Sequence, residues 1–336
     1  MRRFLALLFI TITLGIAQGA NAGPKEDAFA AYRRGDYATA LSLLRPLATQ
    51  GDAWAQSTLG YMYRDGQGVP QDIKEAVRLY RLAAVQGFAL AQFTLGFMYR
   101  DGQGVPQDYK EAVRLFGLAA VQGFALAQNN LGSMYLKGWG VVQDHKEAVR
   151  LYRLAADQGY AIAQVRLGKM YYDGFGVVHD REEAVKWYRL AAVQGDAEGQ
   201  FRLGKMYERG RGVVQDDKEA VKWYRLAAAQ GEAWAQFNLG ARYKDGKGVV
   251  QDHKEAVKWY QLAAAQGIVL AQTDLGMMYD LGQGVAQDYV RAHMWYNLSA
   301  SEKRRDEVAK KLNSSQIQQA QEMAKRCQLS RYQQCD

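Results

Sequence analysis

The residues that most often carry nucleophilic or metal-dependent chemistry are scarce in this chain. Its four histidines, His145, His179, His253 and His293, lie far apart, and no HExxH or GxSxG motif is present. Neither cysteine has a histidine beside it. Metal-dependent and nucleophilic hydrolases need such groups at short, defined spacings. The sequence therefore predicts no catalytic site, no metal site and no cofactor, with the histidines at the surface or in first helical turns.

One glycine-rich segment, Asp65-Gly66-Gln67-Gly68-Val69, could be mistaken for a phosphate-binding loop. The phosphate-binding loops of nucleotide-binding proteins follow a β-strand, and the P-loop also carries a lysine. Neither feature accompanies this segment, and its carboxylates lack the spacing of a calcium loop. Its glycines suit a left-handed helix end and a tight turn, so we expect a structural role.

The elements that position these residues belong to an internal repeat. A unit of 36 residues, Gly51–Gln86, recurs without insertion or deletion, and with 49% hydrophobic residues the chain can build a substantial core. Self-similarity at a fixed period of this length is typical of solenoids, in which each repeat buries its apolar face against its neighbours. The six further copies begin at Gly87, Gly123, Gly159, Gly195, Gly231 and Gly267.

Each copy begins with a predicted helix, called helix A, over about residues Ala53–Arg64 of the first copy. Ala55, Leu59 and Met62 follow at spacings of three and four and form an apolar stripe. Gly60 lies on the same side, where a glycine costs roughly 1 kcal/mol relative to alanine. A cost repeated in every copy indicates a close backbone approach between helices.

A second helix, helix B, is predicted to begin at a capping box formed by Asp72 and Glu75. The box recurs in each copy as far as Asp252 and Glu255. Tyr80 and the alanines around it form the buried stripe of this helix. A series of tryptophans on helix B is interpreted as core or inter-repeat packing rather than as a stacking site for sugars: Trp187, Trp223, Trp259 and Trp295.

The first 22 residues have the three parts of a secretory signal peptide. Arg2 and Arg3 are followed by an apolar stretch of thirteen residues and by the small-x-small site Ala20-Asn21-Ala22, which predicts cleavage before Gly23. The alternative, a membrane anchor, needs about 20 apolar residues. We expect an exported protein, periplasmic or extracellular, with no stable membrane insertion after cleavage.

The remainder divides into three segments. Residues 23–50 read as a degenerate helical pair that caps the array, residues 51–302 hold seven repeats, and residues 303–336 read as two capping helices. Cys327 and Cys335 stand eight positions apart in this last segment, which favours a disulfide in an exported protein. Free thiols and an intermolecular bridge are the alternatives.

The recurring pattern AQxxLGxMYxDGxGVxQDxxEAVxWYRLAAxQG closely resembles the Sel-one-like repeat, a relative of the tetratricopeptide repeat. The resemblance implies an all-α, right-handed α-solenoid of stacked antiparallel helix pairs, with helix A lining the concave side. It also implies an adaptor that gathers other proteins, and exported bacterial members are often linked to envelope function or host interaction. Some cysteine-rich relatives are associated with β-lactamase activity, but they carry paired cysteines in each repeat and this array has none.

Positions that vary between the copies are the candidates for specificity. On helix A they are equivalent to Trp54, Ser57, Thr58, Tyr61 and Arg64, on one face opposite the fixed stripe. We predict that this face binds a partner through aromatic and amide side chains followed by basic ones. The residues are Phe93, Phe97, Asn129, Asn130, Arg166, Lys169, Phe201, Arg202, Lys205, Phe237, Asn238 and Lys244.

An acidic or mixed acidic–aromatic protein or peptide would suit such a face, and ordinary solvated side chains are the alternative interpretation. The net charge of +8 includes Arg2 and Arg3 and is not clustered as in nucleic-acid-binding proteins, so we expect no nucleic acid partner. The sequence thus predicts a monomeric, non-enzymatic interaction scaffold. The alternatives are a peptidoglycan-associated binding module, a host-interaction factor and, less favoured, a hydrolase.

Overall fold

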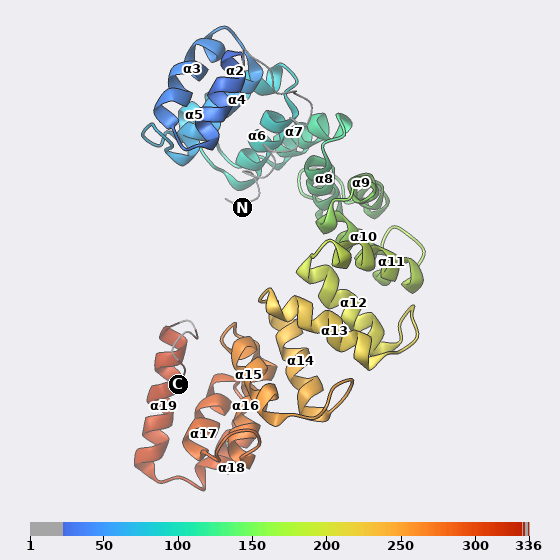
Figure 1. The fold of residues 1–336 in the computed structure, drawn as a ribbon, viewed down its shortest axis with the longest axis vertical. Coiled ribbons are helices and arrows are strands. Elements are labelled where there is room, and N and C mark those ends of the chain that lie inside the picture. Colours follow the sequence, from blue (N-terminus) through green and yellow to red (C-terminus); the bar gives the residue numbers. More distant parts are fainter. Residues whose placement is uncertain (1–22, 331, 333–334, 336) are drawn as a thin grey trace. The chain divides into compact units, whose positions relative to one another are not determined.

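The described chain is built of helices alone. A computed structural model describes residues 23–330, 332 and 335, so the predicted signal peptide at residues 1–22 lies outside it. Within these residues there are 18 helices, α2 to α19, and no strand (Figure 1). The all-α class is therefore confirmed.

The helices occur where the repeat pattern predicts them. Helix A of the seven copies is α4 (Ala53–Asp65), α6 (Ala89–Asp101), α8 (Ala125–Lys137), α10 (Ala161–Asp173), α12 (Ala197–Arg209), α14 (Ala233–Asp245) and α16 (Val269–Leu281). Helix B is α5 (Ile73–Val85), α7 (Tyr109–Val121), α9 (His145–Asp157), α11 (Arg181–Val193), α13 (Asp217–Ala229), α15 (His253–Ala264) and α17 (Tyr289–Leu298). The array is preceded by α2 (Pro24–Arg33) and α3 (Tyr37–Thr49) and followed by α18 (Glu302–Ala309) and α19 (Ser314–Leu329).

The two helices of one copy run antiparallel, as the order of their contacts shows. At one end the Asp72 N–H donates to the Tyr63 carbonyl at 2.9 Å. At the other end the Gln86 side chain donates to Gln56 Oε1 at 2.8 Å. At the end of helix A, Gly66 terminates α4 at a φ of 68°, a left-handed conformation that glycine adopts without strain.

Helix B does not begin with the complete capping box that the sequence predicts, in which each of two side chains accepts a hydrogen bond from a backbone N–H. The Asp72 side chain does accept from the Glu75 N–H at 3.0 Å. However, the Asp72 N–H is already bonded to Tyr63, so Glu75 is free to pair with Arg78 at 2.7 Å. Only the aspartate half of the box therefore forms. The complete box is found at α19, between Asn313 and Gln316.

The glycine inside helix A faces an aromatic ring rather than only backbone. A Cβ atom built on Gly60 would lie 3.1 Å from the ring of Tyr80, and one built on Gly204 would lie 2.8 Å from the ring of Tyr224. These tyrosines are at most 1% exposed, so their rings cannot move aside. The predicted close backbone approach is thus corrected: the ring of helix B is the principal neighbour of the glycine.

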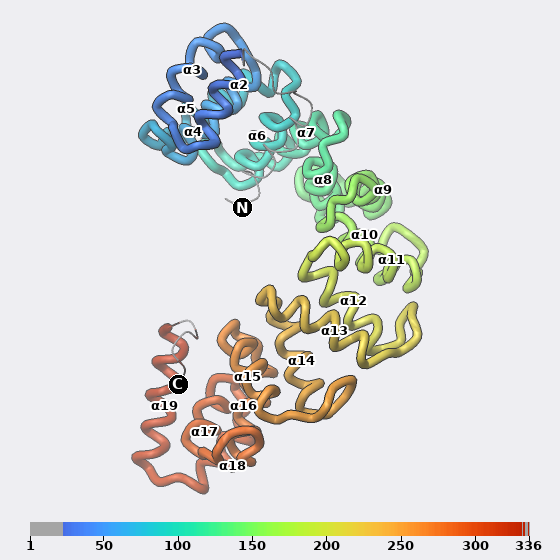
Figure 2. The backbone as a smooth tube through the Cα atoms, in the orientation of Figure 1, coloured from blue at the N-terminus to red at the C-terminus, as the bar shows by residue number. Residues whose placement is uncertain are grey.

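The described residues group into two compact units, which we describe separately. The first contains residues up to 127 together with 138–142, and the second contains the others. In the repeats of each unit, helices that follow one another in the chain pack against one another, and at the C-terminal end both α18 and α19 pack against α17 (Figure 2). The core of the second unit is a series of buried tyrosines with alanines around them: Tyr152, Tyr188, Tyr224, Tyr260 and Tyr296.

The C-terminal segment closes on the last repeat. Cys327, on α19, is fully buried and forms the predicted disulfide with Cys335. Trp295 is 3% exposed, as core packing predicts, whereas the other three tryptophans of the series are half-buried. No described helix combines the length and apolar character that a membrane span needs.

Candidate anion-binding site

Three of the predicted partner-binding residues are buried. Phe93, Asn129 and Phe201 are between 2% and 6% exposed, so the expectation that they lie open on a binding face is wrong. Phe93 packs with ring-centroid distances of 4.8 Å to Phe97 and 5.1 Å to Phe124. Large aromatic side chains at these variable positions fill space between helices, because burial of an aromatic ring is strongly favourable.

Other residues of the predicted set already have partners within the chain. Arg166 donates to Asn129 Oδ1 at 3.0 Å and to the Ser133 hydroxyl. Lys244 pairs with Asp274 at 3.5 Å. Of the remaining members, Lys169 is exposed. The others are half-buried: Phe97, Asn130, Arg202, Lys205, Phe237 and Asn238. The predicted face is therefore broken into separate local clusters.

The histidines do not form a site in the described residues. No group of three or more potential metal ligands occurs there. His145 stacks obliquely on Phe175, with the ring centroids 5.4 Å apart. The expectation of a surface position is wrong for His293, which is 3% exposed, and burial lowers the pKa of its imidazole.

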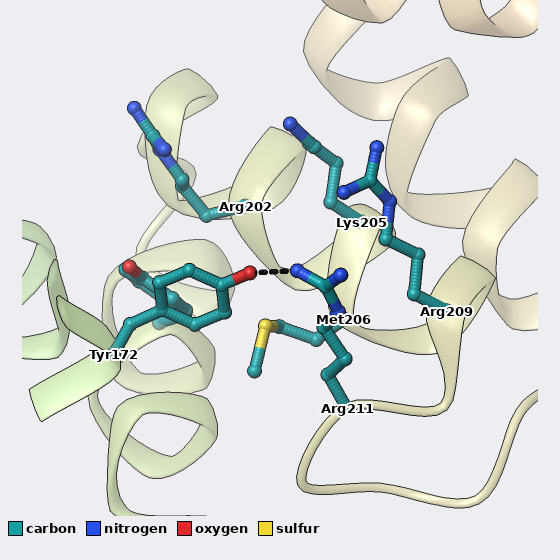
Figure 3. Close-up of a pocket in the computed structure, with 7 residues that line it drawn as sticks. Tyr172, Arg202, Lys205, Met206, Arg209 and Arg211 are labelled. Atoms are coloured by element: carbon teal, nitrogen blue, oxygen red, sulfur yellow. Dashed lines mark hydrogen bonds between the residues drawn. The ribbon is translucent and has the colours of Figure 1, made fainter. Parts of the chain in front are cut away.

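One hollow in the second unit is lined by side chains of two successive copies, and all of its cations come from the fifth copy. We call it the basic hollow; its volume is about 50 Å³. Tyr172 and Tyr188 come from α10 and α11, and the remaining lining residues come from α12 and the loop after it (Figure 3). The lining residues are Tyr172, Tyr188, Arg202, Lys205, Met206, Arg209 and Arg211.

The charges of the basic hollow are poorly balanced. Arg202 pairs with Glu198 at 2.6 Å, and Arg211 donates a hydrogen bond to the hydroxyl of Tyr172 (Figure 3). Among the described residues, neither Lys205 nor Arg209 has a hydrogen bond or an ion pair. No carboxylate lines the hollow.

The charge imbalance of the hollow affects the pKa of Lys205. Burial lowers the pKa of Lys205, and the positive charges of Arg209, Arg202 and Arg211 lower it further. Lys205 also lies over the ring of Phe201, with its Nζ 5.4 Å from the ring centroid. Positive charges gathered around Lys205 create a local positive potential, which favours the binding of an anion.

The next junction between copies has the same architecture but balanced charges. There Glu208 stands where the basic hollow has Tyr172, and Arg242 stands where it has Met206. The hydroxyl of Tyr224, which corresponds to Tyr188, donates to Glu208 Oε2 at 2.5 Å. Arg242 forms ion pairs with Glu208 and with Asp217. At this junction the chain supplies its own carboxylate.

The repeat pattern decides the family. The Sel1 repeat matches seven successive segments that together extend from residue 55 to residue 303: residues 55–88, 89–124, 125–160, 161–196, 197–232, 235–268 and 269–303. The chain belongs to the Sel1 repeat family. Such repeats form solenoids of paired helices and generally mediate protein–protein interaction, and the family is typically non-enzymatic.

Solved structures of Sel1 repeat proteins resemble the chain. A Sel1 repeat protein from Oxalobacter formigenes is 33% identical over 72% of this chain and 97% of its own, with a TM-score of 0.67. A protective antigen of uropathogenic Escherichia coli with an SLR fold is 30% identical over 92% of this chain and 93% of its own, with a TM-score of 0.34. No curated protein matches the chain.

The set of partner-binding residues predicted from the sequence does not include Arg209 and Arg211, which line the basic hollow. Arg209 and Arg211 occupy the places of Asp65 and Gln67 in the glycine loop. The glycines of the loop predict a structural turn and carry no information about the charges beside them. The substitution of an aspartate by an arginine is visible in the sequence, but its meaning depends on Tyr172, one repeat earlier.

Proposed function

We propose that this Sel1 repeat protein is an exported scaffold, without catalytic activity of its own, that binds an acidic protein or peptide at the junction of its fourth and fifth repeats. The observation that carries the proposal is the cluster of cations without matching carboxylates in the basic hollow. Lys169, one repeat earlier on helix A, is exposed and adds a further cation on α10. A preformed helical surface loses little conformational freedom when it binds, which favours affinity.

Export is supported by the disulfide between Cys327 and Cys335, because such bonds persist in oxidising compartments. The predicted signal peptide at residues 1–22 agrees with this assignment. The protein recovered from the exported fraction of its cell should then begin at Gly23.

The test is crosslinking of this mature protein in the exported fraction, followed by affinity measurements on the captured partner. The variant Lys169→Glu/Lys205→Glu reverses two charges that have no ion-pair partner in the described chain. We expect it to weaken binding of the partner by about tenfold or more, since unlike charges become like charges. Wild-type binding should also weaken as salt is raised.

A matched control reverses two exposed lysines on helix B, in the variant Lys146→Glu/Lys218→Glu. It makes the same change in net charge away from the basic hollow. Equal loss of affinity in both variants would contradict a local site. Retention on purified cell-wall sacculi after a high-salt wash, with no protein captured, would overturn the proposed function in favour of an envelope-binding module.

A further inference from the structure

The basic hollow has the features of a subsite for one chemical group. From its geometry we propose that it binds a single carboxylate of the partner, either an aspartate or glutamate side chain or a C-terminal carboxylate. The inference rests on the proposed function only for the nature of the partner. The subsite itself is argued from the side chains of two successive repeats in the second unit.

At the neighbouring junction the chain itself shows which group fits beside the equivalent tyrosine. There the carboxylate of Glu208 accepts from the hydroxyl of Tyr224 and pairs with Arg242. Tyr188 holds the same place in the basic hollow, and its hydroxyl makes no hydrogen bond with the described residues. A carboxylate placed beside Tyr188 would meet the same hydroxyl donor that Glu208 meets one repeat later, with Lys205, Arg209 and Arg211 as the nearby cations in place of Arg242.

The donors around the hollow suit such a group. Lys205 contributes an ammonium group with no ion-pair partner, and Arg209 contributes an equally unpaired guanidinium. Arg211 donates one hydrogen bond to Tyr172, which fixes the orientation of its planar group (Figure 3). Hydrogen bonds between charged donors and carboxylates are about twice as strong as neutral ones. Glutamate or aspartate in the partner would thus be favoured over glutamine or asparagine.

The size of the hollow supports a small group. Its volume of about 50 Å³ accommodates a group of a few heavy atoms, such as a carboxylate. Met206 forms part of the lining in place of the arginine found at the next junction, Arg242. Neither Met206 nor Tyr172, which stands where the next junction has Glu208, carries a carboxylate that could neutralise the surrounding cations.

The experiment uses the mature protein labelled with ¹⁵N at arginine and follows the side-chain N–H signals of Arg209 and Arg211. Four probes are added: acetyl-Gly-Glu-Gly-amide, acetyl-Gly-Gly-Gln with a free C-terminus, acetyl-Gly-Gln-Gly-amide and inorganic phosphate. We expect saturable shifts with one or both of the first two probes and none with the third. Comparison of the first two distinguishes a side-chain carboxylate from a terminal one. Tighter binding of phosphate than of either carboxylate overturns the assignment.

Two variants test the assignment by using residues that other copies already carry. Arg209→Asp/Arg211→Gln restores the loop residues of the first copy, Asp65 and Gln67, and should weaken probe binding by about tenfold or more, read from the shifts of Arg202. The control Lys137→Asp/Lys247→Gln makes the same changes at the same repeat positions elsewhere. Its affinity should equal that of the wild type, and a comparable loss in the control refutes the subsite.

The decisive variant is Tyr172→Glu, which keeps all four cations and copies Glu208. The new carboxylate should occupy the hollow, so binding of the added carboxylate should be lost although the protein stays folded, as circular dichroism would report. Undiminished binding by this variant overturns the proposal.

Failure of the subsite and failure of the function can be told apart. If the captured partner binds the Arg209→Asp/Arg211→Gln variant as tightly as it binds the wild type, the scaffold function is supported and the carboxylate subsite is refuted. If the carboxylate probes bind but no protein partner is captured, the subsite is supported and the proposed scaffold function is refuted.

Discussion

At the scale of single residues, the glycine of helix A shows how packing overrides helix propensity. Gly204 lies against the ring of Tyr224, so a methyl group there has no space. Gly117, within α7, has no atom within 4 Å of the place that a Cβ would take. Two glycines in helices thus have opposite environments. The same substitution should have opposite effects on stability at the two positions.

We expect Gly204→Ala to lower the free energy of unfolding by about 1–3 kcal/mol, the usual cost of overpacking. Gly117→Ala should raise it by up to about 1 kcal/mol, because alanine favours the helix and restricts the unfolded chain. Urea unfolding followed by circular dichroism measures both changes. Stabilisation by both substitutions would contradict a packing role for Gly204.

At the scale of elements, a buried glutamine joins each helix A to both neighbouring helices B. Gln200, on α12, donates to the carbonyl of Ala192 at 3.2 Å and accepts from Gln230 at 2.8 Å. Gln272, on the last helix A, donates to Ala264 at 3.4 Å, but its Oε1 has no partner in the described chain. In the seventh copy the position equivalent to Gln230 is Glu302, whose side chain has no N–H to donate. The side-chain amide of Gln272 thus makes only one of the two hydrogen bonds that Gln200 makes.

Replacement of these two glutamines by alanine should therefore have unequal costs. Gln200→Ala removes two hydrogen bonds, one to the Ala192 carbonyl and one from the Gln230 side chain, and we expect a loss of about 1–3 kcal/mol in the free energy of unfolding. Gln272→Ala removes an unbonded carbonyl along with one long hydrogen bond, so its cost should be smaller by about 1 kcal/mol. Amide hydrogen exchange on the adjoining helices measures the two effects locally. Equal losses in the free energy of unfolding for the two variants would show that the glutamine side chains stabilise the fold by filling space and not by hydrogen bonding.

At the scale of the whole molecule, the array is stabilised by contacts between helices that are neighbours in the chain. In such arrays, stability is approximately a sum over repeats and their nearest-neighbour interfaces. Excision of residues 231–266, one whole copy, should leave a folded protein in which α13 packs against α16. Excision of the 18 residues 231–248 removes helix A alone and should prevent cooperative unfolding. Heat unfolding followed by circular dichroism distinguishes the two.

The excision also tests whether the basic hollow is local. Its lining residues all precede residue 231, so the shorter protein should bind the carboxylate probe as the full protein does. Loss of probe binding in a protein that remains folded would show that the hollow depends on repeats that do not line it.

Much of the fold follows from the sequence because its causes are local and repeated. The positions of Leu59, Gly66 and Asp72 recur in copy after copy, and each acts on helix packing, on a helix end or on a helix start within a few residues. The helix boundaries, the solenoid class and the pairing of Cys327 with Cys335 could therefore be predicted. The aromatic neighbour of Gly60 could not, because propensity does not identify what approaches a glycine.

The candidate site was decided by tertiary structure. Phe93 and Phe201 vary between copies, as surface residues do, yet both are buried, because variation between copies also accommodates different packing. The basic hollow combines Tyr172 from one copy with Arg209, at the end of helix A of the next copy, and Arg211, in the loop after it. Whether a charge is neutralised depends on side chains that lie 30 to 40 residues apart in sequence, as for Glu208 with Arg242. A repeat pattern determines how copies stack, and only the folded chain determines which charges remain unpaired.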